Sequence, residues 1–488
     1  MYIISRYFGK TRAFFTKGIH SMYASKVVQL SIEAFGEANG VKLSPDNRWV
    51  QAATLIPWPE LEEAYKTVFP SNKGRAGKPF RLLFGAHLIK TREGLSDREL
   101  VDAIRDVPAY QFFMGLPEYQ PRRPFVPSAM AHFRKRIAPI AELLENIIGD
   151  WTRKQLVGSV DDKVVILDAT VTPVNIKYPQ DYVLLGQARR NTEAMVTDLA
   201  HKLEVPIPRT YRREAERNYV HFTKHPKRTR KATRGMVKSQ LQYLRRNLRY
   251  IHEFQDQGGQ LTSKQTQRLE VIETLYEQQD YMYRNNTHSV ERRIISLSQP
   301  FVRPIKRGKA KPRNGTEFGP KVDVSIIDGV VGIERFSFDN FNENQDFEDA
   351  LYHYHDVHGE FPDMALVDKL YRTRENLRIA KNLGVKVCGP KLGRQPKYPD
   401  EASERKAKKE AREAENARGE IERNFALMKL KHGLGLVRAK TVETITTTVF
   451  TAMITANIDA VLRLFSLPFV LYVRYEGQIL KIEYNDSI

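Results

Sequence analysis

The pattern of apolar and polar residues predicts a chain of mixed α/β type. Two short apolar runs, 164–167 and 364–367, have the length and composition of strands that are buried on both faces. Two β-rich runs, 322–327 and 330–338, are separated by Asp328-Gly329, a pair of residues typical of a tight hairpin. The later periodicity predicts a helix at 344–357, a strand at 363–367, a helix at 373–383, a strand at 385–387 and a helix within 415–435.

A helical region is expected before the first strand. Its expected helices cover 80–90, 97–105 and 128–137. The first ends at Gly94, and Ser96 with Glu99 forms a capping box that opens the second. Two short helices joined by a turn that contains glycine match a helix-turn-helix. The region is therefore either a DNA-binding module or a helical packing domain that touches no DNA.

A strongly basic segment separates the first strand from the hairpin. Cations dominate between Arg209 and Arg249, and helical periodicity runs through 237–254 and 264–283 with a turn at Gly258-Gly259. We interpret this segment as a helical hairpin whose cations bind DNA phosphates, with a solvated charge run as the alternative. The cations expected to contact DNA are Arg228, Arg230, Lys231, Arg245, Arg246 and Arg249.

Three acidic residues are candidate ligands of a metal ion. Asp168 and Asp368 each end a predicted strand, where open α/β sheets present their functional residues. Arg418, Glu422 and Lys429 recur at steps of four and seven, so they share one face of a helix. Carboxylate oxygens suit hard ions such as Mg²⁺, and two such ions can assist phosphodiester cleavage. Asp168, Asp368 and Glu422 are therefore expected to be both catalytic and metal-binding.

Charge and cysteine content narrow the class of protein. The 488 residues carry a formal net charge of +20, which predicts a polyanionic partner. Ribosomal contact or membrane-surface binding would also fit this charge. A single cysteine excludes a disulfide framework and a structural zinc cluster and is consistent with a reducing cytoplasm. The most apolar stretch, 444–465, is interrupted by Asp459 and Arg463, so a buried helix is expected rather than a transmembrane one, and no membrane is among the expected partners. Residues 1–21 are basic, and we expect either a flexible arm or translation from a start codon further along.

The order strand-Asp, strand-Asp, helix-Glu, with the spacing Arg-x3-Glu-x6-Lys, resembles the DDE transposases of bacterial insertion sequences. Tyr371, three residues after Asp368, matches a motif of the same family. Lys369 and Glu415 depart from it, since relatives carry a small residue and a tyrosine there. The resemblance implies a ribonuclease H-like catalytic core that uses two Mg²⁺ ions, with Mn²⁺ as a possible substitute.

The same resemblance implies which residues contact the ends of the mobile element. Arg418 and Lys429 would hold the DNA backbone, and Lys391 and Arg394 form a second candidate pair that could equally be a charged surface turn. The partners implied are double-stranded DNA, as element ends and target, and further copies of the chain in a homodimer or higher assembly. A cytoplasmic, nucleoid-associated protein is expected.

Six segments follow from these patterns. They are an arm and lead-in at 1–75, a helix-turn-helix-like domain at 76–150, the first part of the ribonuclease H-like core at 160–180, a basic helical insertion and loop at 181–318, the rest of the core at 319–466 and a tail at 467–488. The expected function is binding of terminal inverted repeats, followed by strand cleavage and strand transfer. A metal-dependent nuclease without strand transfer and a domesticated DNA-binding relative are the alternatives.

Overall fold

The computed structural model divides the chain into two compact units. The first comprises 1–172, 322–337 and 341–488, and the second comprises 173–321 with 338–340. The structure describes residues 31–37, 39–69, 77–156, 163–306, 315–390, 401–465, 470–475 and 478–483. The basic segment 1–21 and the candidate DNA contacts Lys391 and Arg394 lie outside these described residues.

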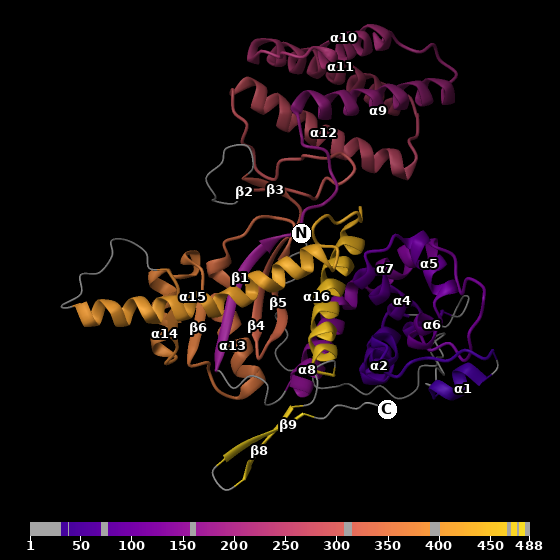
Figure 1. Cartoon of the computed structure of the whole chain (residues 1–488). Helices are drawn as coiled ribbons and strands as arrows, with labels where there is room; N and C mark the ends of the chain where they lie inside the picture. The colour runs from indigo at the N-terminus through magenta and orange to yellow at the C-terminus, as the bar shows by residue number, and fades with distance from the viewer. Residues whose placement is uncertain are drawn as a thin grey trace. The chain divides into compact units, whose positions relative to one another are not determined.

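A five-stranded mixed sheet forms the centre of the first unit, with the strand order β5-β4-β1-β6-β7 (Figure 1). Its strands are β1 (Val164–Val171), β4 (Lys321–Ile327), β5 (Val330–Ser337), β6 (Met364–Val367) and β7 (Lys386–Cys388). Strands β1, β6 and β7 are parallel. Asp328 and Gly329 both have positive φ, 53° and 74°, the backbone of a two-residue turn between antiparallel strands. The hairpin expected at these residues is confirmed.

The alternation of side chains along β1 and β6 assigns the two faces of the sheet. Val165 and Leu167 pack into a core with α13 (Phe347–His358) and α14 (Arg374–Asn382). Val164 and Ile166 face α15 (Glu401–Leu430), which crosses the opposite face. The strands expected at 363–367 and 385–387 and the helices at 344–357 and 373–383 are present within a few residues, the first of these helices opening with the short turn η2 (Glu343–Asp346).

The helical region before β1 is larger than its three expected helices. Its members are α1 (Ile32–Glu37), α2 (Arg48–Leu55), α3 (Trp58–Lys66), α4 (Phe80–Glu93), α5 (Asp97–Asp106), α6 (Pro108–Phe113), α7 (Ser128–Ile137) and α8 (Ala141–Leu156). The end of α4 at Gly94 and the capping box of Ser96 with Glu99 are confirmed. Helices α1 to α3, in the expected lead-in, share one apolar core with α4 to α8.

Helix α16 (Val442–Phe465) joins this helical region to the sheet. Ile454, Ile458 and Leu462 belong to the core of the N-terminal helices. On the same helix, the Asn457 side chain accepts from the Val331 N–H of β5 and donates to the Val331 carbonyl, at 3.0 and 2.9 Å. By length and composition α16 could cross a membrane, but most of its apolar stretch is buried inside the protein. It is the buried helix expected from the sequence.

The second unit is built on four helices with a core of their own. They are α9 (Asp181–Lys202), α10 (Arg212–Lys224), α11 (Arg230–Asp256) and α12 (Ser263–Arg284). The hairpin expected at 237–283 corresponds to α11 and α12, while α9 was not expected and packs along α11. Arg189 of α9 is fully buried and donates to Glu193, Glu216 and Gln240 at 2.6, 2.5 and 3.0 Å.

Asp459 on α16 pairs with two arginines of the N-terminal helices. Its carboxylate oxygens lie 2.6 Å from Arg48 Nη2 and 2.7 Å from Arg92 Nε. Asp459→Asn would leave both cations partly buried without their counter-charge, at a cost of about 2–3 kcal/mol in the free energy of unfolding. Urea unfolding followed by tryptophan fluorescence measures this change.

All three tryptophans, Trp49, Trp58 and Trp151, lie in or against that helical core, so the signal reports on this region. Asp150→Asn is the matched control, because it breaks an ion pair with Arg153 in which Asp150 is mostly exposed, and it should cost less than about 1 kcal/mol. Equal free energies of unfolding for the two variants would contradict the inference that Asp459 stabilises the contact of α16 with the N-terminal helices.

Candidate active site

Asp168 and Asp368 lie side by side on the adjacent inner strands β1 and β6. Asp368 directly follows β6 as predicted, whereas Asp168 lies within β1, which continues to Val171 instead of ending at Asp168. The parallel register pairs Leu167 with Val367, so the residue that follows each of them is an aspartate. Neighbouring strands are about 4.8 Å apart, and strand alternation turns both carboxylates toward the face covered by α15. The structure therefore brings together two of the three predicted ligands, although 200 positions separate them in the sequence.

Asp168 sits in a setting that disfavours its negative charge. Its side chain is 20% exposed and accepts from the Ala169 N–H at 2.8 Å. Burial raises the pKa of the Asp168 carboxyl to about 6, and the charges of Asp368 and Glu343 act in the same direction, whereas the Ala169 N–H and Arg418 lower it. A cation placed between the two aspartates would relieve this repulsion.

Asp368 is fixed by the turn that follows it. Its Oδ1 accepts from the Lys369 N–H at 2.6 Å and caps the 3₁₀ turn η3 (Lys369–Tyr371). Tyr371 is fully buried, and its hydroxyl donates to Asp323 Oδ1 of β4 at 2.5 Å. Burial raises the pKa of the Asp323 carboxyl well above its usual range. Asn376 donates to the Tyr371 carbonyl at 2.9 Å, so the turn is held from two sides.

Arg418 occupies the space between Asp168 and the acids of α15. Its Nη1 lies 3.8 Å from Asp168 Oδ2, and its Nη2 lies 3.0 Å from Glu415 Oε1 and 3.3 Å from Glu422 Oε1. The guanidinium is 11% exposed while Glu422 is 62% exposed. Arg418 and Glu422 share a helix face as predicted. Glu422 contacts Arg418, and Arg418 in turn contacts Asp168.

Two of the three predicted ligands therefore form a site that suits a divalent cation. Within the described ranges, no group of three His, Cys, Asp or Glu side chains is close enough to hold a metal ion. Mg²⁺ is commonly bound by one or two carboxylates together with water and substrate phosphates. The paired oxygen donors of Asp168 and Asp368, with the raised pKa of Asp168, fit this mode of binding.

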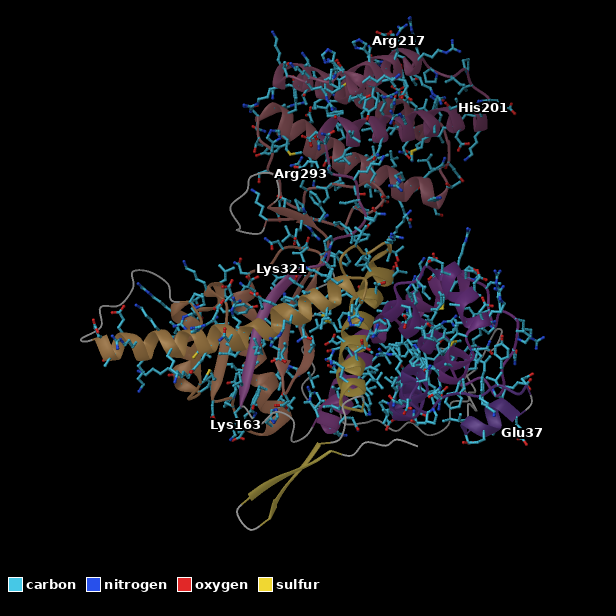
Figure 2. The ribbon with its side chains drawn as sticks, in the orientation of Figure 1. Glu37, Lys163, His201, Arg217, Arg293 and Lys321 are labelled. Carbon is cyan, nitrogen blue, oxygen red and sulfur yellow. The ribbon has the colours of Figure 1, made fainter. Side chains whose placement is uncertain are left out.

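The cations expected to contact DNA occupy varied surroundings. Lys429 lies in the last turn of α15. In the second unit, Arg230 and Lys231 are exposed at the start of α11, and Figure 2 shows Arg217 projecting from α10. Arg245 instead donates to the Tyr276 hydroxyl at 2.6 Å.

Three more of the cations expected to contact DNA have partners inside the second unit. Arg249 Nε lies 3.3 Å from Glu253 Oε1, Arg246 stacks 4.6 Å from the Tyr211 ring, and Arg228 lies over Tyr182 at 5.8 Å. Arg246 and Arg228 therefore pack against tyrosines of this unit, whereas Arg249 forms an exposed ion pair along its own helix.

Two buried acids near the site, Glu343 and Asp323, were not predicted from the sequence. Glu343, in η2, is buried and raises the pKa of Asp168. Asp323 lies inside the strand predicted at 322–327 but was not named as a candidate, and it is fully buried within β4. A signal was present, because an acid inside the apolar run Val322-Asp323-Val324 has to be buried with a partner.

Comparisons with known proteins agree with this arrangement. Residues 39–136 match the family "Transposase domain (DUF772)", and residues 365–459 match the family "Transposase DDE domain". The chain is also 31% identical over 180 residues to the uncharacterized protein ORF8 in the nfe locus of Rhizobium meliloti, covering 36% of this chain and 84% of that protein. The chain belongs to the DDE transposases. No solved structure matches it.

The transposase DDE match covers only part of the site. It includes Asp368, Arg418 and Glu422, and it ends within α16. Asp168 precedes it by nearly 200 positions, so the pairing of β1 with β6 is what joins Asp168 to this transposase site. The other match spans α2 to α7 with only the end of α7 outside, so the N-terminal helices are also a transposase feature.

Tyr371 is expected to stabilise the turn that carries Asp368. Tyr371→Phe removes the hydroxyl that donates to the buried Asp323, which should cost about 1–3 kcal/mol because a buried acceptor loses its donor. Differential scanning calorimetry should show a lower melting temperature for the unit that contains the sheet. Tyr352→Phe is the control, since Tyr352 is half exposed, and it should melt within error of the wild type. A wild-type melting temperature for Tyr371→Phe would mean that Asp323 does not depend on this bond.

Proposed function

We propose that this transposase binds the terminal inverted repeats of an insertion sequence, cleaves DNA strands at its ends and joins them to target DNA. The observation that carries the proposal is the pair of aspartates on adjacent parallel strands, faced by the Arg418 and Glu422 stripe of α15. A nuclease without strand transfer would use the same residues, and the family match favours the transposase.

A ribonuclease H-like catalytic core is part of the proposal. The strand order β5-β4-β1-β6-β7, with the β4-β5 hairpin on one side and parallel strands on the other, supports it. The helix that carries the third acid follows the last strand. The four-helix unit is inserted between β1 and β4, so the core is assembled from segments on both sides of it.

In this proposal Asp168, Asp368 and Glu422 are the catalytic carboxylates. Asp168 and Asp368 would hold Mg²⁺ or Mn²⁺, with Glu422 completing the set for two ions. Such ions supply charge neutralisation at the scissile phosphate and activate the attacking oxygen. The Lys369 N–H would fix the direction of the Asp368 carboxylate, and the bond from Tyr371 to Asp323 would hold the turn that follows it.

DNA would be held by cations of both units. Arg418, Lys429, Lys391 and Arg394 are the proposed backbone contacts of the catalytic unit. The proposed contacts of the second unit are Arg228, Arg230, Lys231, Arg245, Arg246 and Arg249. Since phosphate contacts fix register without reading bases, the N-terminal helices are the proposed site of sequence recognition. We further propose assembly as a homodimer or larger complex on DNA in the cytoplasm.

Asp168→Asn, Asp368→Asn and Glu422→Gln each remove a ligand charge while keeping the shape of the side chain. Each variant should reduce strand cleavage by at least about 10³-fold, because the metal no longer stabilises the transition state. Binding to a DNA duplex that carries the element end should stay close to wild type. Gel-based cleavage in Mg²⁺ and fluorescence anisotropy measure the two properties.

Glu420→Gln is the matched control on the same helix. Glu420 lines a cavity of about 330 Å³ under α15, together with Ala417 and Ile166, and it is not one of the proposed ligands. The Glu420→Gln variant should cleave DNA at the wild-type rate. Wild-type cleavage by any of the three ligand variants would remove that residue from the proposed site.

The exposed cations of the second unit are expected to set the salt dependence of DNA binding. Replacing Arg230, Lys231, Arg245 and Arg249 by Gln should flatten the slope of log affinity against log salt by roughly 0.9 for each phosphate that the protein no longer neutralises. Affinity should fall alike for unrelated DNA and for the element end. Titrations at several salt concentrations give the slope.

The double variant Lys202→Gln with Arg284→Gln serves as the control, because both cations lie in the same unit and are not among the proposed DNA contacts. It should keep the wild-type slope. If the fourfold variant also kept that slope, the DNA footprint would belong to the N-terminal helices instead.

A further inference from the structure

Arg418 places a positive charge between two of the proposed metal ligands, Asp168 and Glu422. Its guanidinium contacts Asp168 at 3.8 Å on one side and Glu422 at 3.3 Å on the other, so a single positive group links β1 to the helix. Glu415 adds a third carboxylate to the same guanidinium at 3.0 Å. The Nε of Arg418 is buried and makes no hydrogen bond to any described residue.

The charges of the three carboxylates and of Arg418 therefore offset one another in this state. Asp168 and Asp368 repel each other, and Arg418 is the cation that offsets this repulsion. A divalent ion on Asp168 would have to compete with the guanidinium for the same carboxylate charge. Two cations so close would repel each other in a partly buried site, where water screens their charges only weakly.

The geometry points to Arg418 as an internal placeholder that blocks tight metal binding until DNA arrives. When a DNA phosphate approaches, it offers the guanidinium a new bidentate partner. Arg418 then leaves Asp168 and Glu422, and both carboxylates become available to the metal. Binding of DNA and of metal would be positively coupled through this one side chain. This inference rests on the proposed function, since it takes Asp168 as a ligand.

The apolar contacts of α15 leave room for such a change. Between the helix and the sheet lies the cavity of about 330 Å³, lined on the helix by the small residues Ala414 and Ala417. Nearer the carboxyl end of the helix, Ile421 and Met428 are buried and anchor it. The helix residues that line the cavity therefore lie on both sides of Arg418, and the anchored part of the helix begins at Ile421.

The test is a titration of the full-length protein with Mn²⁺ alone, in which free Mn²⁺ is followed by electron paramagnetic resonance. Arg418→Gln should bind Mn²⁺ about tenfold more tightly than wild type, or about 1.4 kcal/mol. Arg418→Lys, which keeps the charge on a single nitrogen, should fall between the two. Arg423→Gln removes the same charge from an exposed position of the same helix and should bind like wild type.

A second titration includes a short DNA duplex, after subtraction of Mn²⁺ bound by the DNA alone. The duplex should tighten Mn²⁺ binding by wild type and have a much smaller effect on Arg418→Gln, because that variant has no placeholder to remove. Equal or weaker Mn²⁺ affinity of Arg418→Gln, or unchanged coupling to DNA, overturns the inference. The Arg418→Lys titration decides the question if Arg418→Gln fails to fold.

Asp168→Asn distinguishes a failure of the proposed metal site from a failure of the role proposed for Arg418. If this variant loses Mn²⁺ binding while Arg418→Gln behaves as wild type, the metal site stands and the placeholder role is wrong. If Asp168→Asn binds Mn²⁺ as wild type does, the proposed metal site itself fails, and the role of Arg418 fails with it.

Discussion

The parallel pairing of β1 with β6 is the constraint on which the candidate site depends. Register and strand alternation together turn Asp168 and Asp368 to one face of the sheet. A slip of one residue would send one carboxylate into the apolar core under α13. That core, built from Val165, Leu167 and Val367 with Phe347, is therefore what holds the chemistry in place.

Charge is distributed differently in the two units. In the unit with the sheet, the buried Glu343 adds negative charge near Asp168, Asp323 is buried against Tyr371, and Arg418 places a positive group 3.8 Å from Asp168. The inserted unit has its own apolar core and its own buried ionic cluster around Arg189. Its many surface cations therefore belong to a unit that folds around a core separate from that of the sheet. This separation is consistent with one unit that performs chemistry on phosphates and another that attracts them.

Much of the fold could be predicted from local pattern. The hairpin at Asp328-Gly329, the capping box at Ser96, the strand ending before Asp368 and the helix face of Arg418 and Glu422 are all present. Each depends on neighbours within a few residues, where backbone preference and side-chain period act directly. The strand expected to end at Asp168 instead continues to Val171. Helix α9 was missed because apolar residues lie all round it, which weakens the helical period that marks a surface helix.

The sequence by itself determined which apolar runs form the strands of the sheet and which residues share a helix face, because both follow from local geometry. Only the tertiary structure decided that Asp168 adjoins Asp368, that Tyr371 holds Asp323, and that Arg418 stands between Asp168 and Glu422. It also decided that several cations of the basic segment pack against tyrosines. These contacts join residues far apart in the chain, and they arise from sheet register, burial and the need to pair buried charge, none of which a local pattern specifies.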